Sequence, residues 1–167
     1  ATGNVVPVKP INTFLDRWEA LSDRAVSHDG PMKIAVVGAG AGGVEILLAI
    51  QHRLKNLRTA VGKSADNMEF HLFSDTDDIL PTHNGLVRRT FMETLKARGV
   101  VLHMSNAVAE VMHGALRTVQ EETFQADEIL WVTAAGAPAW PRDAGLDVDD
   151  GGFIKVGDTL QSTSHPD

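Results

Sequence analysis

Apolar positions along the chain follow two rhythms, one typical of helices and one typical of buried strands. The helical rhythm, with apolar residues three or four positions apart, predicts three helices: residues 11–27, 44–54 and 84–98. Short, partly β-branched apolar runs predict four buried strands: residues 33–37, 68–73, 100–104 and 128–133. Residues 1–10 carry neither rhythm, so we expect them to be a loose lead.

The order of these elements predicts an α/β fold. Strands and helices alternate up to residue 104, and such alternation implies parallel strands joined by right-handed crossovers. Residues 107–112 and 115–119 then indicate two antiparallel strands around a His113-Gly114 turn, so that a β-meander replaces one crossover helix. We therefore expect a Rossmann-like parallel sheet with helices on both faces and a β-meander crossover.

A glycine-rich segment lies directly between the strand at 33–37 and its helix. It runs Gly38-Ala39-Gly40-Ala41-Gly42-Gly43. In dinucleotide-binding folds the first glycine of such a motif makes the turn, the second lets the backbone approach a pyrophosphate, and the third allows close helix packing. The pyrophosphate then binds the positive end of the helix. The strand–loop–helix context therefore indicates a site for NAD(P), FAD or S-adenosylmethionine.

Further residues at the expected carboxyl edge of the sheet could contact the rest of a dinucleotide. Asp75, with Ser74 as an equal alternative, follows the second strand, where a ribose contact is expected. No Lys or Arg occurs in residues 74–84, which favours NAD over NADP. Glu45 follows the glycines and is assigned to the nicotinamide side of the cleft. Small residues at the end of the last strand would admit a ring at Ala135 and Gly136.

Composition removes several other classes of function. The formal net charge of −7 offers no footprint for nucleic acid or for an anionic membrane surface. Without cysteine the chain forms neither a disulfide nor a zinc–thiolate site, and its histidines show no metal-ligand spacing. Without tyrosine it lacks the Tyr-x-x-x-Lys pair of short-chain dehydrogenases. The sequence shows no secretory signal, transmembrane segment or nucleophile–base pair, so we assign no catalytic and no metal-binding residue.

The sequence resembles the pyridine nucleotide-disulfide oxidoreductase superfamily over nearly its whole length. The segment from Lys33 to Glu45 is similar to the second nucleotide-binding motif of that superfamily. The most similar branch is that of the FAD-containing NADH dehydrogenase-like proteins, which includes fusions to selenide, water dikinase. Further segments match this branch: residues 79–84, 130–138, 152–156 and 159–167.

The resemblance implies an NAD(H)-binding domain inserted in a flavoprotein, in which NADH reduces FAD. It implies that Gly38, Gly40 and Gly43 hold the pyrophosphate, and that Glu45 and Gly136 lie at the nicotinamide end. The adenine ribose falls to Asp75 or Ser74. Ser74 stands where the family usually carries a carboxylate at the end of the second strand, and this departure concerns ribose recognition.

The resemblance also implies a division of the chain and a partner. Residues 1–30 would be an N-terminal linker and helix, 31–145 the NAD(H)-binding domain, and 146–167 a tail leading back to an FAD domain. The amino-terminal FAD motif is absent, so we expect a fragment that binds NAD(H) but not FAD and is inactive alone. We expect the FAD domain of the same protein as partner, in the cytoplasm or peripheral to a membrane, and keep a homodimer open.

Two other functions fit the residues themselves. A non-catalytic nucleotide-sensing module would carry the same glycine loop, and the sequence does not separate it from an oxidoreductase domain. An S-adenosylmethionine methyltransferase also has a glycine-rich motif after its first strand, although the meander and the tail fit that class badly.

Overall fold

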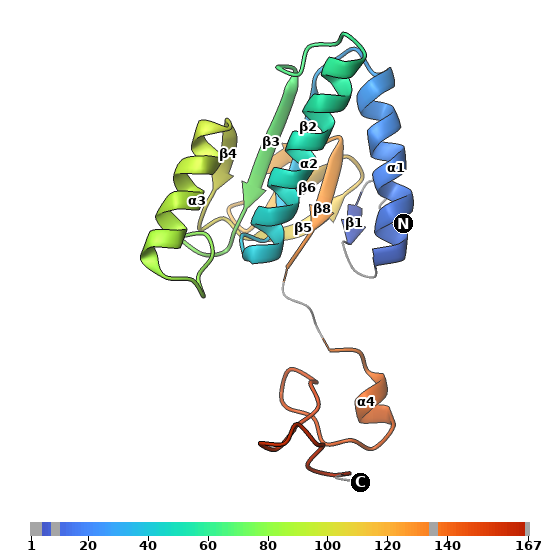
Figure 1. Cartoon of the computed structure of the whole chain (residues 1–167), viewed down its shortest axis with the longest axis vertical. Coiled ribbons are helices and arrows are strands. Elements are labelled where there is room, and N and C mark those ends of the chain that lie inside the picture. The colour runs from blue at the N-terminus through green and yellow to red at the C-terminus, as the bar shows by residue number, and fades with distance from the viewer. Residues whose placement is uncertain (1–4, 8–10, 134–136, 166–167) are drawn as a thin grey trace. The chain divides into compact units, whose positions relative to one another are not determined.

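The computed structural model describes residues 5–7, 11–133 and 137–165. The chain divides into two compact units, residues 1–133 and 134–167, and each is described by itself. The described part of the first unit contains a parallel sheet, a small antiparallel sheet and three long helices (Figure 1).

The larger sheet has five strands, all parallel, in the order β1-β8-β2-β3-β4. The strands are β1 (Val5–Pro7), β2 (Met32–Val37), β3 (Met68–Phe73), β4 (Val100–His103) and β8 (Glu128–Trp131). The β2 strand is buried along almost its whole length, as expected of a strand covered on both faces. This parallel sheet confirms the predicted α/β class and its Rossmann-like character.

Three helices accompany the strands: two agree with their predicted limits to within one residue, whereas the middle one extends beyond the predicted 44–54 at both ends. They are α1 (Ile11–Ser27), α2 (Ala41–Ala60) and α3 (Gly85–Ala97). The buried residues of α2 recur at helical spacing, and Val44, Leu47 and Leu54 are among them. The start of α3 is fixed by Asn84, whose side-chain oxygen accepts a hydrogen bond from the Val87 backbone N–H at 3.0 Å.

The layers differ from the expectation of helices on both faces. Buried residues of α1, α2 and α3 share one apolar cluster with side chains from one face of the sheet, such as Ile34, Val36 and Leu72. The opposite face, with Ala35 and Val37, packs instead against the meander. Alternate β2 residues therefore belong to different cores, because successive strand side chains point to opposite faces. In Figure 1 the helices lie in front of the sheet and the meander behind it.

The meander has three antiparallel strands rather than the two that were expected. They are β5 (Val108–Met112), β6 (Ala115–Thr118) and β7 (Thr123–Gln125), in that order across the sheet. The third strand is only 3 residues long and contributes one apolar side chain, Phe124, so it leaves no alternating pattern in the sequence. The meander itself is confirmed.

The prediction of a loose lead over residues 1–10 was wrong for Val5–Pro7. These residues form β1, the edge strand, and pair with Ile129, Leu130 and Trp131 of β8. The register joins segments more than 120 positions apart, which no local pattern reveals. Pro7 is compatible with this position because an edge strand leaves one row of N–H groups unpaired.

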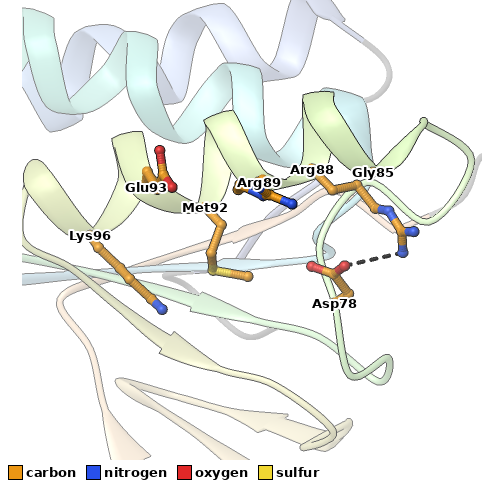
Figure 2. A pocket seen from close by; sticks show the side chains of 7 residues that line it. All are labelled: Asp78, Gly85, Arg88, Arg89, Met92, Glu93 and Lys96. Atoms are coloured by element: carbon orange, nitrogen blue, oxygen red, sulfur yellow. Dashed lines mark hydrogen bonds and ion pairs between the residues drawn. The ribbon is translucent and has the colours of Figure 1, made fainter.

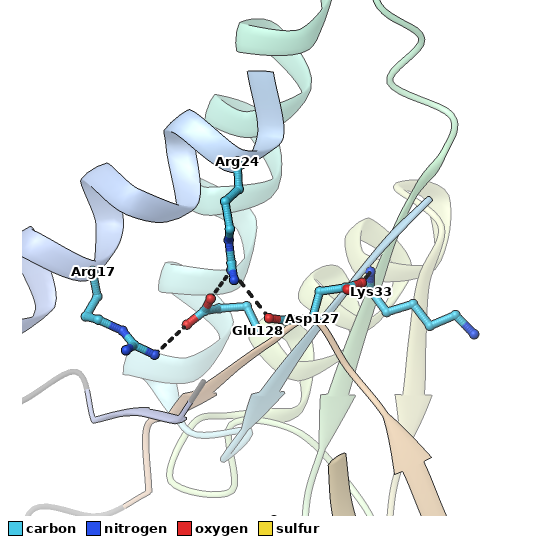
Figure 3. A network of polar contacts seen from close by, with 5 residues as sticks. All are labelled: Arg17, Arg24, Lys33, Asp127 and Glu128. Atoms are coloured by element: carbon cyan, nitrogen blue, oxygen red, sulfur yellow. Dashed lines mark hydrogen bonds and ion pairs between the residues drawn. The ribbon is translucent and has the colours of Figure 1, made fainter. Parts of the chain in front are cut away.

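A polar network ties α1 to the first residue of β8 (Figure 3). Glu128 is only 3% exposed, and its carboxylate is paired with Arg24 and, at 3.4 Å, with Arg17. Burial raises the pKa of Glu128, and the two guanidinium groups oppose that rise. The neighbouring Asp127 accepts the Lys33 backbone N–H at 2.7 Å, which aligns β8 with β2. A buried carboxylate is tolerated here because two cations hold it.

Two imidazoles lie between the parallel sheet and the meander. His71 Nδ1 lies 3.1 Å from His103 Nε2, at hydrogen-bonding distance. The His103 ring stacks on Phe73 at 4.1 Å, and Phe124 of β7 packs against His71 with ring centroids 4.4 Å apart. Burial is the main cause that lowers the pKa of both histidines. The meander is therefore joined to the sheet through an aromatic cluster that contains titratable groups.

The second unit has little regular structure. It contains one short helix, α4 (Trp140–Asp143), and two isolated antiparallel bridges, Val148 with Ile154 and Val156 with Ser162. Several large apolar side chains are exposed: Trp140, Phe153, Ile154, Val156 and Leu160. Among its described residues Pro141 alone falls in the buried class, so this unit has no core of its own.

Candidate functional site

Predicted site residues from the β2–α2 and β3–α3 connections meet at the carboxyl edge of the parallel sheet. Val37, the last residue of β2, pairs with Phe73 of β3 and with Trp131 of β8. Gly38 and Ser74 follow directly at the same edge, as do Val132 and Thr133 after β8. The chain leaves β2 toward β3 on one side, and β8 lies on the other. This is the switch point at which open α/β sheets bind ligands.

Gly38 has a conformation and a neighbour that exclude any side chain. Its φ is +113°, outside the range that L-residues adopt. A Cβ atom at this position would lie 2.6 Å from the carbonyl oxygen of Val132. The Gly38 N–H donates to the Phe73 carbonyl at 2.9 Å. The first glycine therefore holds the turn between three strand ends.

Gly43 is required for packing within the loop. A Cβ atom there would lie 1.7 Å from the carbonyl oxygen of Gly38, a distance that no pair of unbonded atoms tolerates. The first turn of α2 can lie against the end of β2 only because this position carries no side chain. This is the role that the spacing of the motif assigns to its last glycine.

Gly40 differs from both, because nothing in the described part of the protein requires it to be glycine. Its backbone is extended, with φ −70° and ψ −179°, and no atom of the described residues lies within 4 Å of the position of a Cβ. Gly40 is exposed. A side chain would therefore extend into open space, which is the space that a pyrophosphate would occupy if the backbone is to approach it.

The start of α2 presents backbone donors to that space. The first helical hydrogen bond runs from Val44 N–H to the Gly40 carbonyl at 3.1 Å. The amides of Ala41, Gly42 and Gly43 precede it and have no acceptor within the helix. Ala41 and Gly42 are exposed, and the Gly40 cap has no side chain to satisfy these donors. Such a helix start attracts an anion through its N–H groups and its dipole.

The structure separates the two candidates for ribose recognition. Ser74 is 5% exposed, and its hydroxyl hydrogen-bonds with Thr76 Oγ1 at 2.8 Å and accepts the Thr76 N–H at 3.2 Å. Asp75 is exposed, and in the described part of the chain its carboxylate has no hydrogen-bonding or ionic partner. Ser74 thus shapes the loop, whereas the carboxylate of Asp75 is available to a ligand.

The candidates for the nicotinamide end are only partly placed. Glu45 is exposed and is the fifth residue of α2. Thr133 is exposed after β8. Ala135 and Gly136 lie outside the described residues. Ala39 is buried, so its side chain is unavailable to a ligand.

The loop after β3 contacts the glycine loop, and the sequence did not reveal this contact. The backbone N–H of Leu80 donates to the Ala39 carbonyl at 2.8 Å, so the loop after β3 lies against the glycine loop. Arg88 of α3 reaches Asp78 of this loop at 3.1 Å. In the sequence alone Arg88 and Arg89 resemble a solvated helix face, and the structure instead gives Arg88 an ionic partner. The only signal of this ion pair in the sequence is that Asp78 and Arg88 lie ten positions apart, on either side of the predicted start of the helix.

Neither a metal site nor a membrane-spanning helix occurs in the described part of the chain. Within the described ranges no three His, Asp or Glu side chains gather closely enough to bind a metal ion. Across the same ranges, none of the helices has the length and apolar character needed to cross a bilayer.

The sequence matches the family model described as pyridine nucleotide-disulphide oxidoreductase over residues 4–167. The chain belongs to that family. This confirms the resemblance inferred from the glycine loop and the later segments. A curated member, the type II NADH:quinone oxidoreductase of Haemophilus influenzae, is 25% identical over 138 residues, which make up 81% of this chain and 31% of that protein.

Solved structures of pyridine nucleotide-disulphide oxidoreductases and their neighbours share the fold. Reduced Bacillus anthracis CoADR-RHD superposes with a TM-score of 0.71 at 22% identity, over 98% of this chain and 26% of that one. The water-forming NADH oxidase from Lactobacillus brevis, solved bound to NADH, gives 0.70 at 18% identity, over 98% and 33%. The chain thus spans about a third or less of the length of these proteins.

Proposed function

We propose that this chain is the NAD(H)-binding domain of an FAD-dependent NADH oxidoreductase. In this proposal the domain positions NADH for hydride transfer to an FAD held by a partner domain of the same protein. Family membership supports an oxidoreductase, and two of the similar proteins are named for their use of NADH. The observation that carries the proposal is the open space beside Gly40, at the start of α2 and at the switch point of the sheet.

Different residues bind different parts of the dinucleotide in this proposal. The pyrophosphate lies beside Gly40 and accepts hydrogen bonds from the exposed amides at the start of α2. Asp75 accepts hydrogen bonds from the adenine ribose hydroxyls, and a carboxylate there repels a 2′-phosphate, which favours NADH over NADPH. Glu45 and the segment that contains Ala135 and Gly136 face the nicotinamide. When bound, NADH supplies the hydride that reduces the flavin.

The direct test is calorimetric titration of this chain with NADH, NADPH and S-adenosylmethionine. We expect NADH to bind, and Gly40→Val to weaken it by about 10- to 100-fold, because the valine displaces charge-assisted hydrogen bonds worth about 1.5–3 kcal/mol each. Gly85→Val is the matched control, since a Cβ there also meets no atom within 4 Å. Both variants should keep the thermal stability of the unchanged chain.

Each alternative outcome contradicts a named part of the proposal. Tighter binding of NADPH would contradict the role of Asp75. Binding of S-adenosylmethionine alone would exclude the oxidoreductase function. NADH binding by this chain, with no NADH-dependent bleaching of a flavin in the longer protein, would instead indicate a nucleotide-sensing module.

A further inference from the structure

The loop between β3 and α3, residues 74–84, is organised around Asp78. Its Oδ2 accepts a hydrogen bond from Arg88 Nη1 at 3.1 Å, and its Oδ1 accepts the Ile79 N–H at 2.8 Å. Its backbone carbonyl accepts the Thr76 hydroxyl at 2.8 Å. One residue therefore connects the α3 helix with both sides of the loop. Asp75, the proposed ribose ligand, is the second residue of this loop.

The same loop braces the phosphate-binding segment. Leu80 N–H donates to the carbonyl of Ala39, which precedes Gly40, at 2.8 Å. Leu80 does this with a φ of +52°, in the left-handed region that a leucine adopts only under constraint. Ile79 and Leu80 are buried, at 0% and 3% exposure, and so anchor the loop in the apolar core. Contacts on both sides of Leu80 must hold this conformation.

Arg88 is distinguished from the other cations nearby by having a partner. It lies at one end of a groove of about 420 Å³ that runs along α3 (Figure 2). Arg89 and Lys96 line the same groove, and in the part of the chain that the structure describes neither makes an ion pair. Figure 2 shows the Arg88 guanidinium directed at Asp78 and Arg89 directed elsewhere. All three cations make the groove positive, but only Arg88 among them forms an ion pair with Asp78, a contact that we call the brace.

We propose that Arg88 is a positioning residue for dinucleotide binding. Acting through Asp78, it keeps the 74–84 loop in the conformation that presents Asp75 and supports Ala39 beside Gly40. This role for Arg88 rests on the proposed function, because it makes NADH binding depend on a residue outside the glycine loop. If the ordered loop is populated only about a tenth of the time without the brace, the apparent affinity for NADH falls about tenfold.

The first test compares NADH binding by Arg88→Met and Arg89→Met. Each variant removes one positive charge from the groove, but only the first breaks the contact with Asp78. We expect the dissociation constant for NADH to be about tenfold higher in Arg88→Met and to change by less than about twofold in Arg89→Met. Arg88→Lys, which keeps a cation within reach of the carboxylate, should recover part of the loss. Equal affinities for the two methionine variants would overturn the inference.

The second test needs no nucleotide. Amide hydrogen exchange reports whether the Leu80 N–H still bonds to Ala39, because exchange requires the loop to open. We expect faster exchange at Leu80 in Arg88→Met, with unchanged rates in the β2 and β3 strands and in Arg89→Met. Unchanged protection at Leu80 would show that Arg88 does not hold the loop. Failure of the unchanged chain to bind NADH, with the exchange difference present, would contradict the proposed function rather than the brace.

Discussion

Gly43 lies against the backbone of Gly38, whereas Gly40 faces open space. The two residues belong to one short loop and to one motif, yet their surroundings demand glycine for different reasons. At Gly43 the demand comes from inside the protein, where a carbonyl oxygen occupies the place of a side chain. At Gly40 the demand comes from a ligand that the loop would hold. Stability and binding should therefore separate when each is substituted.

We predict that Gly43→Ala lowers the free energy of unfolding by about 3 kcal/mol or more, because the methyl group must displace the Gly38 backbone. Gly40→Ala should change it by less than about 0.5 kcal/mol, as expected of an exposed site without contacts. Urea denaturation followed by circular dichroism measures both. Equal losses in the two variants would contradict the packing role of Gly43.

At the scale of elements, the joint between the parallel sheet and the meander depends on protonation. His71 and His103 share a hydrogen bond that requires one unprotonated ring nitrogen as acceptor; His71 is buried and His103 is partly buried, with Phe124 and Phe73 packed against them. The charged groups that act on the pair are Glu69 and Lys33 on His71 and Glu122 on His103. Burial outweighs the two carboxylates and lowers the pKa of each histidine below 6.5.

We predict that the pair makes folding pH-dependent on the acid side. The folded state binds fewer protons than the unfolded chain, so the stabilisation is present above pH 6.5 and is lost progressively as the pH falls from there through the lowered pKa values of the folded state. Urea midpoints at pH 7.5 and about 5.5 should differ more for the unchanged chain than for His103→Gln. His83→Gln, at an exposed position, should leave the difference unchanged. A pH dependence as large in His103→Gln as in the unchanged chain would argue against the pair.

Elements that bury a periodic face were predictable from the sequence, and those held by distant pairing were not. The α3 helix and the β2 and β3 strands carry enough apolar residues to define their own limits, whereas α2 was found by its apolar residues but continues into the polar segment after Leu54. The β1 and β7 strands have 3 residues each and exist through the strands beside them. Which face a helix covers is likewise a property of the whole sheet, and the sequence placed helices on a face that the meander occupies.

The candidate site divides in the same way. The spacing of Gly38, Gly40 and Gly43 is a local pattern, and it identified the loop. Ser74 and Asp75 differ in whether the side chain forms hydrogen bonds within the loop, which the sequence does not show. The ion pair between Arg88 and Asp78 likewise depends on how α3 lies against the loop that precedes it. Both are set by tertiary contacts that leave no spacing of their own.

For the whole molecule, the division at residue 133 separates a unit with two apolar cores from one whose described residues form none. Both clusters consist of residues that precede position 133. The second unit exposes large apolar side chains such as Phe153 and Leu160. Together with the share of about a third that this chain covers in its relatives, this supports the proposal that residues 146–167 lead toward a partner domain.

We predict that a chain ending at Thr133 keeps the stability of the first unit. Removing residues 134–167 takes away no member of either core, so the melting temperature should change by less than about 3 °C. Thermal denaturation followed by circular dichroism of the shortened and the complete chain provides the comparison. A large drop in melting temperature would show that the second unit stabilises the first.

The contrast between the glycines also has an evolutionary consequence. Selection for foldability alone would preserve Gly38 and Gly43 in any descendant of this domain, whatever it had ceased to bind. Gly40 has no such protection, because no atom of the described residues lies where its side chain would be. A lineage that abandoned the nucleotide would accumulate larger residues at this one position while keeping the other two. The residue found at position 40 in related chains would thus record which of them still depend on a dinucleotide.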